Sequence, residues 1–387
     1  VDKVISLLEE SLVQIKDSFK QIIEGPYVTG ITKITEKGYK SCSTTMLPKG
    51  TILLSSRAPI GLLAIAKIEL CTNQGFKNIV PQNEFVDNNY LYYLLSLKIK
   101  EIEALGSGTT FKEVSKTSLE NYEINIHDIA EQQKIANTLN VIDDKIALNN
   151  KINNELEQIA KTLYEYWFVQ FDFPDEKGRP YKSANGKMVY NEVLKREIPD
   201  GWEVKNIFDV LDIQYGYPFN TELFTGNKGY SVVRIRDILT NSISAHTVEK
   251  ADGKYKLHEG DLLIGMDGNF HMNYWNETGA YLNQRCVRIR CKKGTPLSVI
   301  QAKYSLEPFI KKREQNISRT TVGHLSDKDF KSQYILVPKI NPYFNPKKAF
   351  ECILYKITNN NNEIKKLVSL RDFLLPLLMN GQVSVQC

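Results

Sequence analysis

The chain has 387 residues, of which 42% are hydrophobic and 25% charged; this composition excludes a wholly disordered protein and allows two or three domains with cores of their own. Its formal net charge of +5 permits nucleic-acid binding without requiring it, because the excess is small beside 50 lysines and arginines. No apolar run is long enough to span a membrane and the N-terminus has no signal-peptide profile, which argues against a membrane or exported protein.

The chain opens with an amphipathic pattern. Apolar residues recur in steps of four and three between Val1 and Ile22 and predict a helix over residues 1–24, which Gly25-Pro26 ends. Together with the strands and helix that follow, this helix belongs to an expected first domain, residues 1–130. Short β-prone runs between turn signals predict strands near residues 51–54, 61–68 and 76–80, and tyrosine and leucine at helical spacing predict a helix over residues 89–105.

Residues 131–168 carry a heptad pattern. Their apolar side chains alternate in steps of four and three wherever the series is unbroken, and Asn149, Asn153 and Ala160 interrupt it. A seam this narrow is typical of a helix that pairs with another helix in one register, whereas an ordinary amphipathic helix on a globular core would show a wider stripe. The predicted seam consists of Ile135, Leu139, Ile142, Ile146, Leu156, Leu163 and Trp167.

The second half of the chain repeats this order. Residues 169–198, rich in proline, glycine and charged residues, predict a linker or extended arm. A second globular domain is expected over residues 199–343, and a second spacer helix over residues 344–387, where Asn360 again interrupts the seam. Within the second domain, strands are predicted near residues 232–235, 262–264 and 286–291, and a helix over residues 296–314. The second seam begins at Phe350 and continues through Ile353, Ile357, Ile364, Leu367, Leu374 and Leu378.

The two halves are related by a duplication. Matching seam positions differ by one constant, since 353−142 and 374−163 both equal 211. The similarity extends into the globular segments, where the turn that ends at Gly50 matches the turn that ends at Gly260 (260−50 = 210). Outside this framework the loops differ, with Ser55-Ser-Arg-Ala-Pro59 in one copy and Gly265-Met-Asp-Gly-Asn269 in the other. A common scaffold with different loop residues is what two readers of two different targets would show.

The sequence lacks the common motifs for catalysis or metal binding. It has no G-x-x-x-x-G-K-[ST] phosphate loop, no H-E-x-x-H and no G-x-S-x-G elbow. Asn341-Pro-Tyr-Phe344 resembles the N-P-P-[YF] motif of amino-methyltransferases, but the second proline is absent and no glycine-rich cofactor turn precedes it. We interpret it as the loop that leads into the second long helix. The five histidines are far apart and lack metal-ligand spacing.

The six cysteines show no C-x-x-C spacing and no close histidine partner. They therefore predict reduced thiols, and neither a zinc site nor a disulfide framework, in a cytoplasmic protein. The six are Cys42, Cys71, Cys286, Cys291, Cys352 and Cys387.

Polar and planar side chains in glycine-marked loops favour a binding function. Asparagine and glutamine can pair with adenine, arginine with guanine, and serine or threonine with bases or phosphates. Asn73-Gln74 and Asn283-Gln284 occur in both copies, so capping a turn of the framework explains them as well as DNA reading does. The candidate DNA-binding residues are Ser55, Ser56, Arg57, Asn73, Gln74, Thr109, Thr110, Lys112, Asp267, Asn269, Asn283, Gln284, Arg285, Arg319, Thr320, Thr321 and His324.

Several longer stretches occur in a characteristic order. They are Leu47-Pro-Lys-Gly-Thr-Ile-Leu-Leu-Ser-Ser-Arg-Ala-Pro-Ile-Gly61, Cys71-Thr-Asn-Gln-Gly-Phe76, Gly106-Ser-Gly-Thr-Thr-Phe-Lys-Glu113, Ile142-Asp-Asp-Lys-Ile146, Trp167-Phe-Val169, Ile198-Pro-Asp-Gly-Trp202 and Leu370-Arg-Asp-Phe-Leu-Leu-Pro-Leu-Leu378. With these stretches the chain resembles the specificity subunit of a type I restriction–modification system, from about residue 27 to the end.

The resemblance implies an α+β fold in which two homologous β-rich target-recognition domains are separated by two long antiparallel coiled-coil helices. Each domain would read one part of a split, asymmetric DNA sequence. It also implies a subunit without catalysis, cofactor or metal of its own. Two modification subunits that bind S-adenosylmethionine would dock on it, and restriction subunits would join them, so that ATP and Mg²⁺ belong to the partners.

The length of the predicted helix agrees with a spacer. Residues 135–167 would rise about 50 Å at ~1.5 Å per residue, on the order of one to one and a half turns of DNA. The alternative is a duplicated coiled-coil adaptor that binds protein and no DNA. One departure from the family pattern concerns the first copy, because the counterpart of Pro199-Asp-Gly-Trp202 would fall before residue 1.

Overall fold

The computed structural model describes residues 27–28, 34–57, 59–108, 112–268, 270–315 and 323–385. Its contacts divide the chain into two compact units: unit 1 is Val1–Asn150 with Glu363–Cys387, and unit 2 is Lys151–Asn362. Two long helices, α6 (Ile129–Tyr164) and α11 (Pro346–Met379), each contribute one part to either unit. The helix predicted over residues 1–24 lies outside the described residues.

Unit 1 holds a four-stranded sheet with short helices. Its elements besides the long helices are β1 (Tyr27–Val28), α2 (Glu36–Lys40), β2 (Ile52–Ser55), β3 (Leu63–Ala66), β4 (Phe76–Ile79), α3 (Asn88–Leu97), α4 (Ile99–Ala104) and α5 (Lys116–Glu120). The strand order is β1-β3-β2-β4, in which β2 is antiparallel to both neighbours and β1 is parallel to β3. The three predicted strands are thus confirmed, and the helix predicted over 89–105 is split into α3 and α4.

The core of unit 1 joins the sheet to α3, and α3 to the long helices. Ile52, Leu54 and Ile65 from the sheet pack against Leu91 and Leu95 of α3. The opposite side of α3 buries aromatic and apolar side chains against both long helices. This second cluster contains Tyr90, Tyr93, Leu94, Ile135, Ala136, Leu139, Leu375, Leu378 and Met379.

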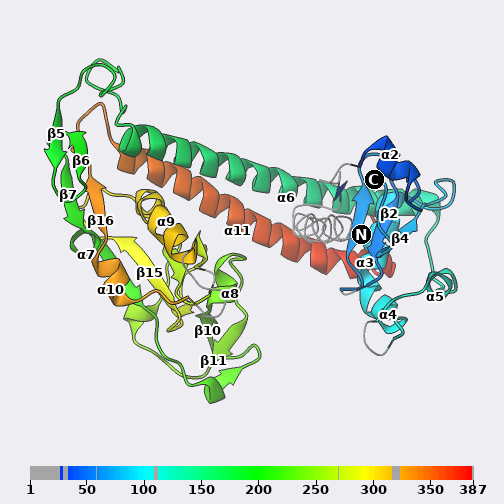
Figure 1. Ribbon diagram of the computed structural model, residues 1–387. Helices are drawn as coiled ribbons and strands as arrows, with labels where there is room; N and C mark the ends of the chain where they lie inside the picture. The colour runs from blue at the N-terminus through cyan, green and yellow to red at the C-terminus, as the bar shows by residue number, and fades with distance from the viewer. Residues whose placement is uncertain are drawn as a thin grey trace. The chain divides into compact units, whose positions relative to one another are not determined.

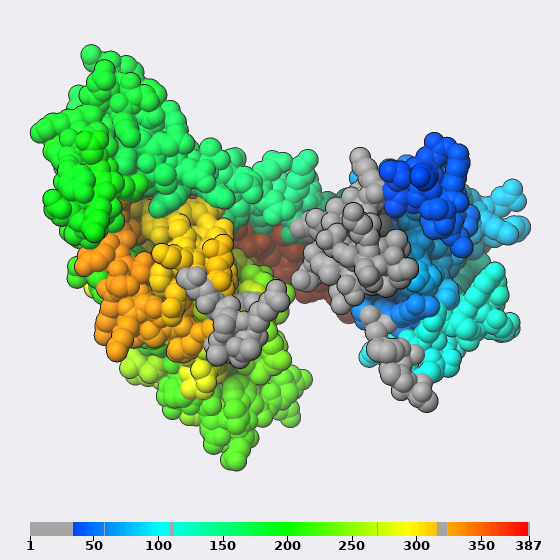
Figure 2. Space-filling view, viewed as in Figure 1, coloured from blue at the N-terminus to red at the C-terminus, as the bar shows by residue number. Residues whose placement is uncertain are grey.

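Unit 2 is larger and has several sheets. Its elements besides the long helices are η2 (Glu165–Val169), β5 (Met188–Asn191), β6 (Arg196–Pro199), β7 (Glu203–Asn206), α7 (Ile207–Val210), β8 (Leu211–Tyr215), η3 (Thr221–Leu223), β9 (Phe224–Thr225), β10 (Tyr230–Val233), α8 (Ile235–Ile238), β11 (Ala245–Thr247), η4 (Gly253–Tyr255), β12 (Leu262–Gly265), β13 (Met272–Tyr274), β14 (Tyr281–Leu282), β15 (Cys286–Cys291), α9 (Val299–Gln315), α10 (Asp327–Lys331) and β16 (Tyr334–Val337). The two four-stranded sheets have the orders β13-β12-β15-β8 and β14-β10-β11-β9. Figure 2 shows α9, in yellow, at the surface of this unit.

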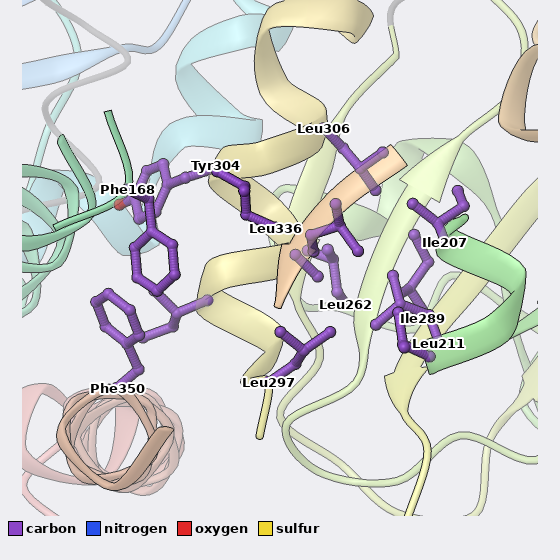
Figure 3. Close-up of a cluster of buried hydrophobic side chains, with 14 of the residues drawn as sticks. Phe168, Ile207, Leu211, Leu262, Ile289, Leu297, Tyr304, Leu306, Leu336 and Phe350 are labelled. Carbon is purple, nitrogen blue, oxygen red and sulfur yellow. The ribbon is translucent and has the colours of Figure 1, made fainter. Parts of the chain in front are cut away.

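One large apolar cluster forms the core of unit 2. Strand residues such as Leu262 and Ile289 meet Tyr304 and Leu306 of α9 there, together with Phe168 of η2 and Phe350 of α11 (Figure 3). The strands of unit 2 and its parts of the long helices therefore share one core, and separating them would expose a large apolar area to water.

The predicted seams pair α6 with α11 in antiparallel orientation within each unit (Figure 1). In unit 1, Ile135 and Leu139 near the start of α6 pack with Leu378 near the end of α11. In unit 2, the ring of Trp167 lies 5.6 Å from that of Phe350, near the start of α11. The pairing of the two helices is confirmed.

Buried amides occupy the middle of the helix pair, as the interrupted seams predict. In unit 1, Asn149 donates from Nδ2 to Glu363 Oε2 at 2.8 Å. In unit 2, Asn153 donates to Asn361 Oδ1 at 2.7 Å and accepts from Asn360 Nδ2 at 2.9 Å. Asn149 and Asn153 are both buried. Because a shift of one helix would leave these amides buried without partners, they specify the register.

The backbone confirms the duplication. The central antiparallel strands β3-β2-β4 of unit 1 correspond to β13-β12-β15 of unit 2, and β2 and β12 begin 210 residues apart (262−52). Gly50 and Gly260 both adopt left-handed backbone angles, with φ of 89° and 84°, in the turn before these strands. The sheet of β14, β10, β11 and β9 belongs to unit 2 and has no counterpart among the described residues of unit 1.

The segment 171–198 differs from the predicted linker. It forms the hairpin of β5 and β6, and Phe171 and Phe173 are buried. The Phe173 ring stacks on Trp202 at 4.9 Å and on Phe344 at 4.5 Å. The proline, glycine and charge of this segment mark its turns, while its aromatic residues attach it to unit 2.

Within the described ranges, none of the helices combines the length and the apolar character needed to cross a membrane.

Candidate nucleic-acid interface

The first candidate residues follow strand β2 in unit 1. Ser55 and Ser56 are buried, and their hydroxyl groups donate to backbone carbonyls: Ser55 to Pro59 at 2.7 Å and Ser56 to Gly75 at 3.1 Å. Ser55 Oγ also accepts from the backbone N–H of Leu62 at 2.8 Å. The geometry thus gives these two serines a framework role and does not present them at the surface.

Arg57, the next residue, is exposed and paired. Its Nε lies 3.1 Å from Glu113 Oε2, and Lys77 Nζ lies 3.2 Å from the other oxygen of the same carboxylate. The hydrogen bond from Lys77, with a smaller contribution from Arg57, lowers the pKa of Glu113. The backbones of residues 57 and 113 also meet in an antiparallel bridge. Lys112, beside Glu113, is exposed.

Unit 2 has a related cluster after strand β12. Asp267 Oδ1 lies 2.5 Å from His324 Nδ1, and Asp267 Oδ2 lies 2.8 Å from Arg285 Nη1. Because a carboxylate only accepts hydrogen bonds, the Nδ1–H of His324 is the donor. Residues 267 and 324 also form an antiparallel bridge. The structure therefore brings three of the predicted residues of this copy into one cluster.

The paired Asn-Gln dipeptides support the framework alternative for their asparagines. Asn73 Oδ1 accepts from the backbone N–H of Gly75 at 2.9 Å, and Asn283 Oδ1 accepts from that of Arg285 at 3.4 Å. Each amide thus closes a turn two residues on. The neighbouring Gln74 and Gln284 are exposed. Six candidates lie outside the described residues: Thr109, Thr110, Asn269, Arg319, Thr320 and Thr321.

The acidic and basic partners of these clusters were not predicted from the sequence. Glu113 and Lys77 were not among the candidates, although Glu113 stands 211 residues before His324 and the repeat offset therefore indicated its position. Nor was Arg288 predicted, which lies buried in β15 and pairs with Asp212. Nothing in the local pattern of β15 distinguishes this arginine from an exposed one.

In the described part of the chain, no group of three or more histidine, cysteine, aspartate or glutamate side chains could hold a metal ion. The segment 341–344 forms a turn in which Asn341 Oδ1 accepts from the backbone N–H groups of Tyr343 and Phe344, at 2.8 and 2.9 Å. Phe344 is buried, and α11 begins two residues later. The interpretation of this segment as the loop leading into the second long helix is confirmed.

Comparison with known proteins decides the family. The sequence matches the family described as "Type I restriction modification DNA specificity domain" over residues 9–158 and 199–367. It is 34% identical over 378 residues to the type I restriction enzyme MjaIX specificity subunit of Methanocaldococcus jannaschii, covering 92% of this chain and 83% of that one. The chain belongs to this family. The type I HindI specificity subunit of Haemophilus influenzae is 23% identical over 372 residues, covering 80% of either chain.

A solved specificity subunit shares the fold. The crystal structure of the type I restriction–modification S subunit from M. genitalium aligns with a TM-score of 0.54 and 18% sequence identity, covering 92% of this chain and 88% of that one. The α+β fold class, with two homologous recognition domains and two long helices, is confirmed. The chain is a DNA sequence-specificity subunit.

The specificity subunit exposes apolar side chains along its long helices. In the unit 1 part of α6, Val141 and Leu148 are 69% and 51% exposed. In unit 2, Ile152 and Ile159 of α6 and Tyr166 of η2 are exposed as well. Within each unit these residues follow one another in steps of seven, so they lie on one side of the helix and form a second apolar stripe besides the buried seam.

Proposed function

We propose that this specificity subunit reads a bipartite, asymmetric DNA site, with unit 1 contacting one part and unit 2 the other. The observation that carries the proposal is the duplicated framework with unlike exposed residues. Lys112 is exposed beside the Arg57–Glu113 pair in unit 1, whereas Arg285 is exposed beside the Asp267–His324 pair in unit 2. Two copies of one scaffold that offer different donors and acceptors would select different bases.

An asymmetric site follows from having both readers in one chain. A symmetric homodimer presents the same surface twice and requires a palindrome, whereas these two units differ in sequence throughout their loops. The sheet of β14, β10, β11 and β9 adds to this difference, because the described residues of unit 1 have no counterpart of it. The proposal therefore expects two half-sites of unrelated sequence.

The long helices are proposed as the docking surface for two modification subunits, with restriction subunits joining that assembly. The second apolar stripe on α6 supports this, because a regular row of exposed aliphatic side chains is the surface on which a partner helix packs. Val141, Leu148 and Ile159 are each about half exposed or more.

Catalysis is assigned to the partners. The absence of catalytic motifs from the sequence and the family's role in specificity support a subunit that binds DNA without transforming it. S-adenosylmethionine, ATP and Mg²⁺ would then be held by the modification and restriction subunits, and this chain would need no cofactor.

Methylome sequencing tests the proposal. Cells that carry this chain with its modification partner should show methylation at one split sequence with two unlike halves. Cells in which unit 2 is exchanged for that of another specificity subunit should keep one half and change the other. A single continuous methylated sequence, or loss of both halves on exchange, would contradict the proposal.

Salt dependence separates the proposal from the coiled-coil adaptor. When a protein neutralises several phosphates, bound counterions are released. The logarithm of its binding constant therefore falls linearly with log[salt]. The purified chain should therefore bind random duplexes at low salt and lose affinity as salt rises. An adaptor without a DNA surface would bind no duplex under either condition.

A further inference from the structure

The clusters at Arg57 and Asp267 occupy equivalent places in the two units. Residues 57 and 267 differ by 210, and residues 113 and 324 by 211. Two backbone hydrogen bonds beside them also correspond. Val114 N donates to Ser56 O at 3.1 Å, as Leu325 N donates to Met266 O at 2.8 Å; Ser56 N donates to Gly75 O, as Met266 N donates to Arg285 O.

At these equivalent places the carboxylate and the side chain that donates to it are exchanged. In unit 1 the cation, Arg57, follows strand β2. The carboxylate, Glu113, lies on the later segment that pairs with the end of this strand, called here the returning segment. In unit 2 the carboxylate, Asp267, follows the strand, and His324 stands on the returning segment. A second cation meets the carboxylate in both units, Lys77 at 3.2 Å in one and Arg285 at 2.8 Å in the other.

This exchange shows which property the two copies share. Neither residue type is retained at either position, yet in both units a nitrogen donor faces a carboxylate. Exposed ion pairs contribute little to stability, so stability alone gives no reason for keeping such a pair at a partly exposed place twice. When two contacting positions change together, the contact between the two side chains is retained although the residues are not.

We propose that Arg57–Glu113 and Asp267–His324 are equivalent positioning pairs that hold two chain segments of each recognition domain together, and that these four side chains do not read bases. In each unit the pair joins the end of the central strand to the returning segment, which carries Lys112 in unit 1. The inference rests on the proposed function, since it assigns the pairs to the DNA-contacting side of each unit.

Charge exchange in unit 2 tests the inference. Asp267→Arg places a cation beside Arg285 and His324, and His324→Glu places a carboxylate beside Asp267, so each single variant creates like-charge contacts. The double variant Asp267→Arg/His324→Glu restores opposite charges and reproduces the chemistry of unit 1, including the second cation supplied by Arg285. The variants are compared in the complete assembly of this chain with its modification partner.

The readouts are affinity for duplexes carrying the methylated site, with either half scrambled as controls, and the methylated sequence itself. Each single variant should lose affinity for the unit 2 half by about tenfold, on the order of one lost base-pair contact, and keep its preference for the unit 1 half. The double variant should recover to within about threefold of the original affinity and methylate the same sequence.

Three results would overturn the inference. In the first, the single variants bind DNA as tightly as the original chain. In the second, the double variant binds as weakly as the single variants although its melting temperature is restored; in the third, it methylates a changed half-site. The last result would show that Asp267 or His324 reads a base. The proposed function fails separately, if the unmodified assembly shows no sequence preference at all.

Discussion

At the scale of single residues, Gly216 shows how closely two backbones approach in unit 2. Its N–H donates to Cys286 O at 3.0 Å, and a Cβ at this position would collide with the backbone carbonyl of Asn283. Backbone cannot move aside as the end of a flexible side chain can. The close approach of β8 to the segment before β15 therefore requires glycine.

Gly216→Ala should reduce the free energy of unfolding by about 2–4 kcal/mol, because the new methyl group must displace backbone. Gly226→Ala is the matched control: no heavy atom lies within 4 Å of its added Cβ, so its effect should stay within about 0.5 kcal/mol. Urea denaturation of both variants measures the difference. Equal effects would show that the strand pair can open without cost.

The cysteines differ in burial. Burial raises the pKa of the Cys286 thiol, and it raises that of Cys291 to about 12. Cys42 and Cys352 are exposed. Because the thiolate is the reacting form, iodoacetamide at about pH 8 should label Cys42 and Cys352 well before Cys286 and Cys291. Mass spectrometry after timed labelling checks this order, with the unfolded chain as control; early labelling of Cys286 would contradict the buried position of β15.

At the scale of elements, a tyrosine connects a shorter helix to α6 in both units. The shorter helix is α3 in unit 1 and α9 in unit 2. Tyr93 Oη donates to Asp143 Oδ2 at 2.6 Å, and Arg371 Nη1 lies 2.8 Å from the other oxygen. In unit 2 the equivalent Tyr304 (304−93 = 211) donates to Glu157 Oε2 at 2.9 Å, beside Lys303. Each contact combines a tyrosine, a carboxylate on α6 and a cation. Burial, followed by the Asp143 charge, raises the pKa of Tyr93, so its hydroxyl remains a donor at neutral pH.

Tyr93→Phe should lower the free energy of unfolding by about 1.5–3 kcal/mol, since it removes a hydrogen bond to a buried, charged acceptor. Tyr92→Phe changes the neighbouring tyrosine on the same helix, whose hydroxyl makes no hydrogen bond to the described residues, and should have a much smaller effect. Thermal unfolding of the two variants compares them. A loss no larger for Tyr93→Phe than for Tyr92→Phe would mean that apolar packing alone attaches α3 to the long helices.

At the scale of the whole molecule, the two long helices are the elements that both units share. If they act as the spacer between two readers, lengthening both together should change the gap between half-sites and leave the half-sites themselves unchanged. Four residues inserted after Asn150 and four after Asn361 (361−150 = 211) add about one turn to each helix, or ~6 Å.

The expected outcome is a methylated sequence with the same two halves and a gap longer by about one or two base pairs, at ~3.4 Å each. Methylome sequencing measures the gap. A four-residue insertion after Gly178 is the control, because this glycine lies in an exposed turn with no heavy atom within 4 Å of an added Cβ. An unchanged gap in the lengthened chain would refute the spacer function.

The sequence by itself determined the duplication, the two long helices and their pairing, and most strands of the central sheets. These features are local or periodic: a heptad seam follows from helix geometry, and a constant offset of about 210 residues relates each element to its counterpart. Of the asparagines that interrupt the seams, Asn149 and Asn153 are buried and Asn360 is half-buried, at positions that the same periodicity assigns to the seam.

Only the tertiary structure decided the roles of the loop residues. Ser55 and Ser56 resemble surface residues in sequence, yet their hydroxyls serve the interior, and Arg57 finds its carboxylate 56 residues away at Glu113. Residues 171–198 have the composition of a linker, but Phe173 stacks on Trp202 and Phe344. Such contacts depend on where distant segments return in space. No local periodicity records that position, because it is set by the packing of the whole unit.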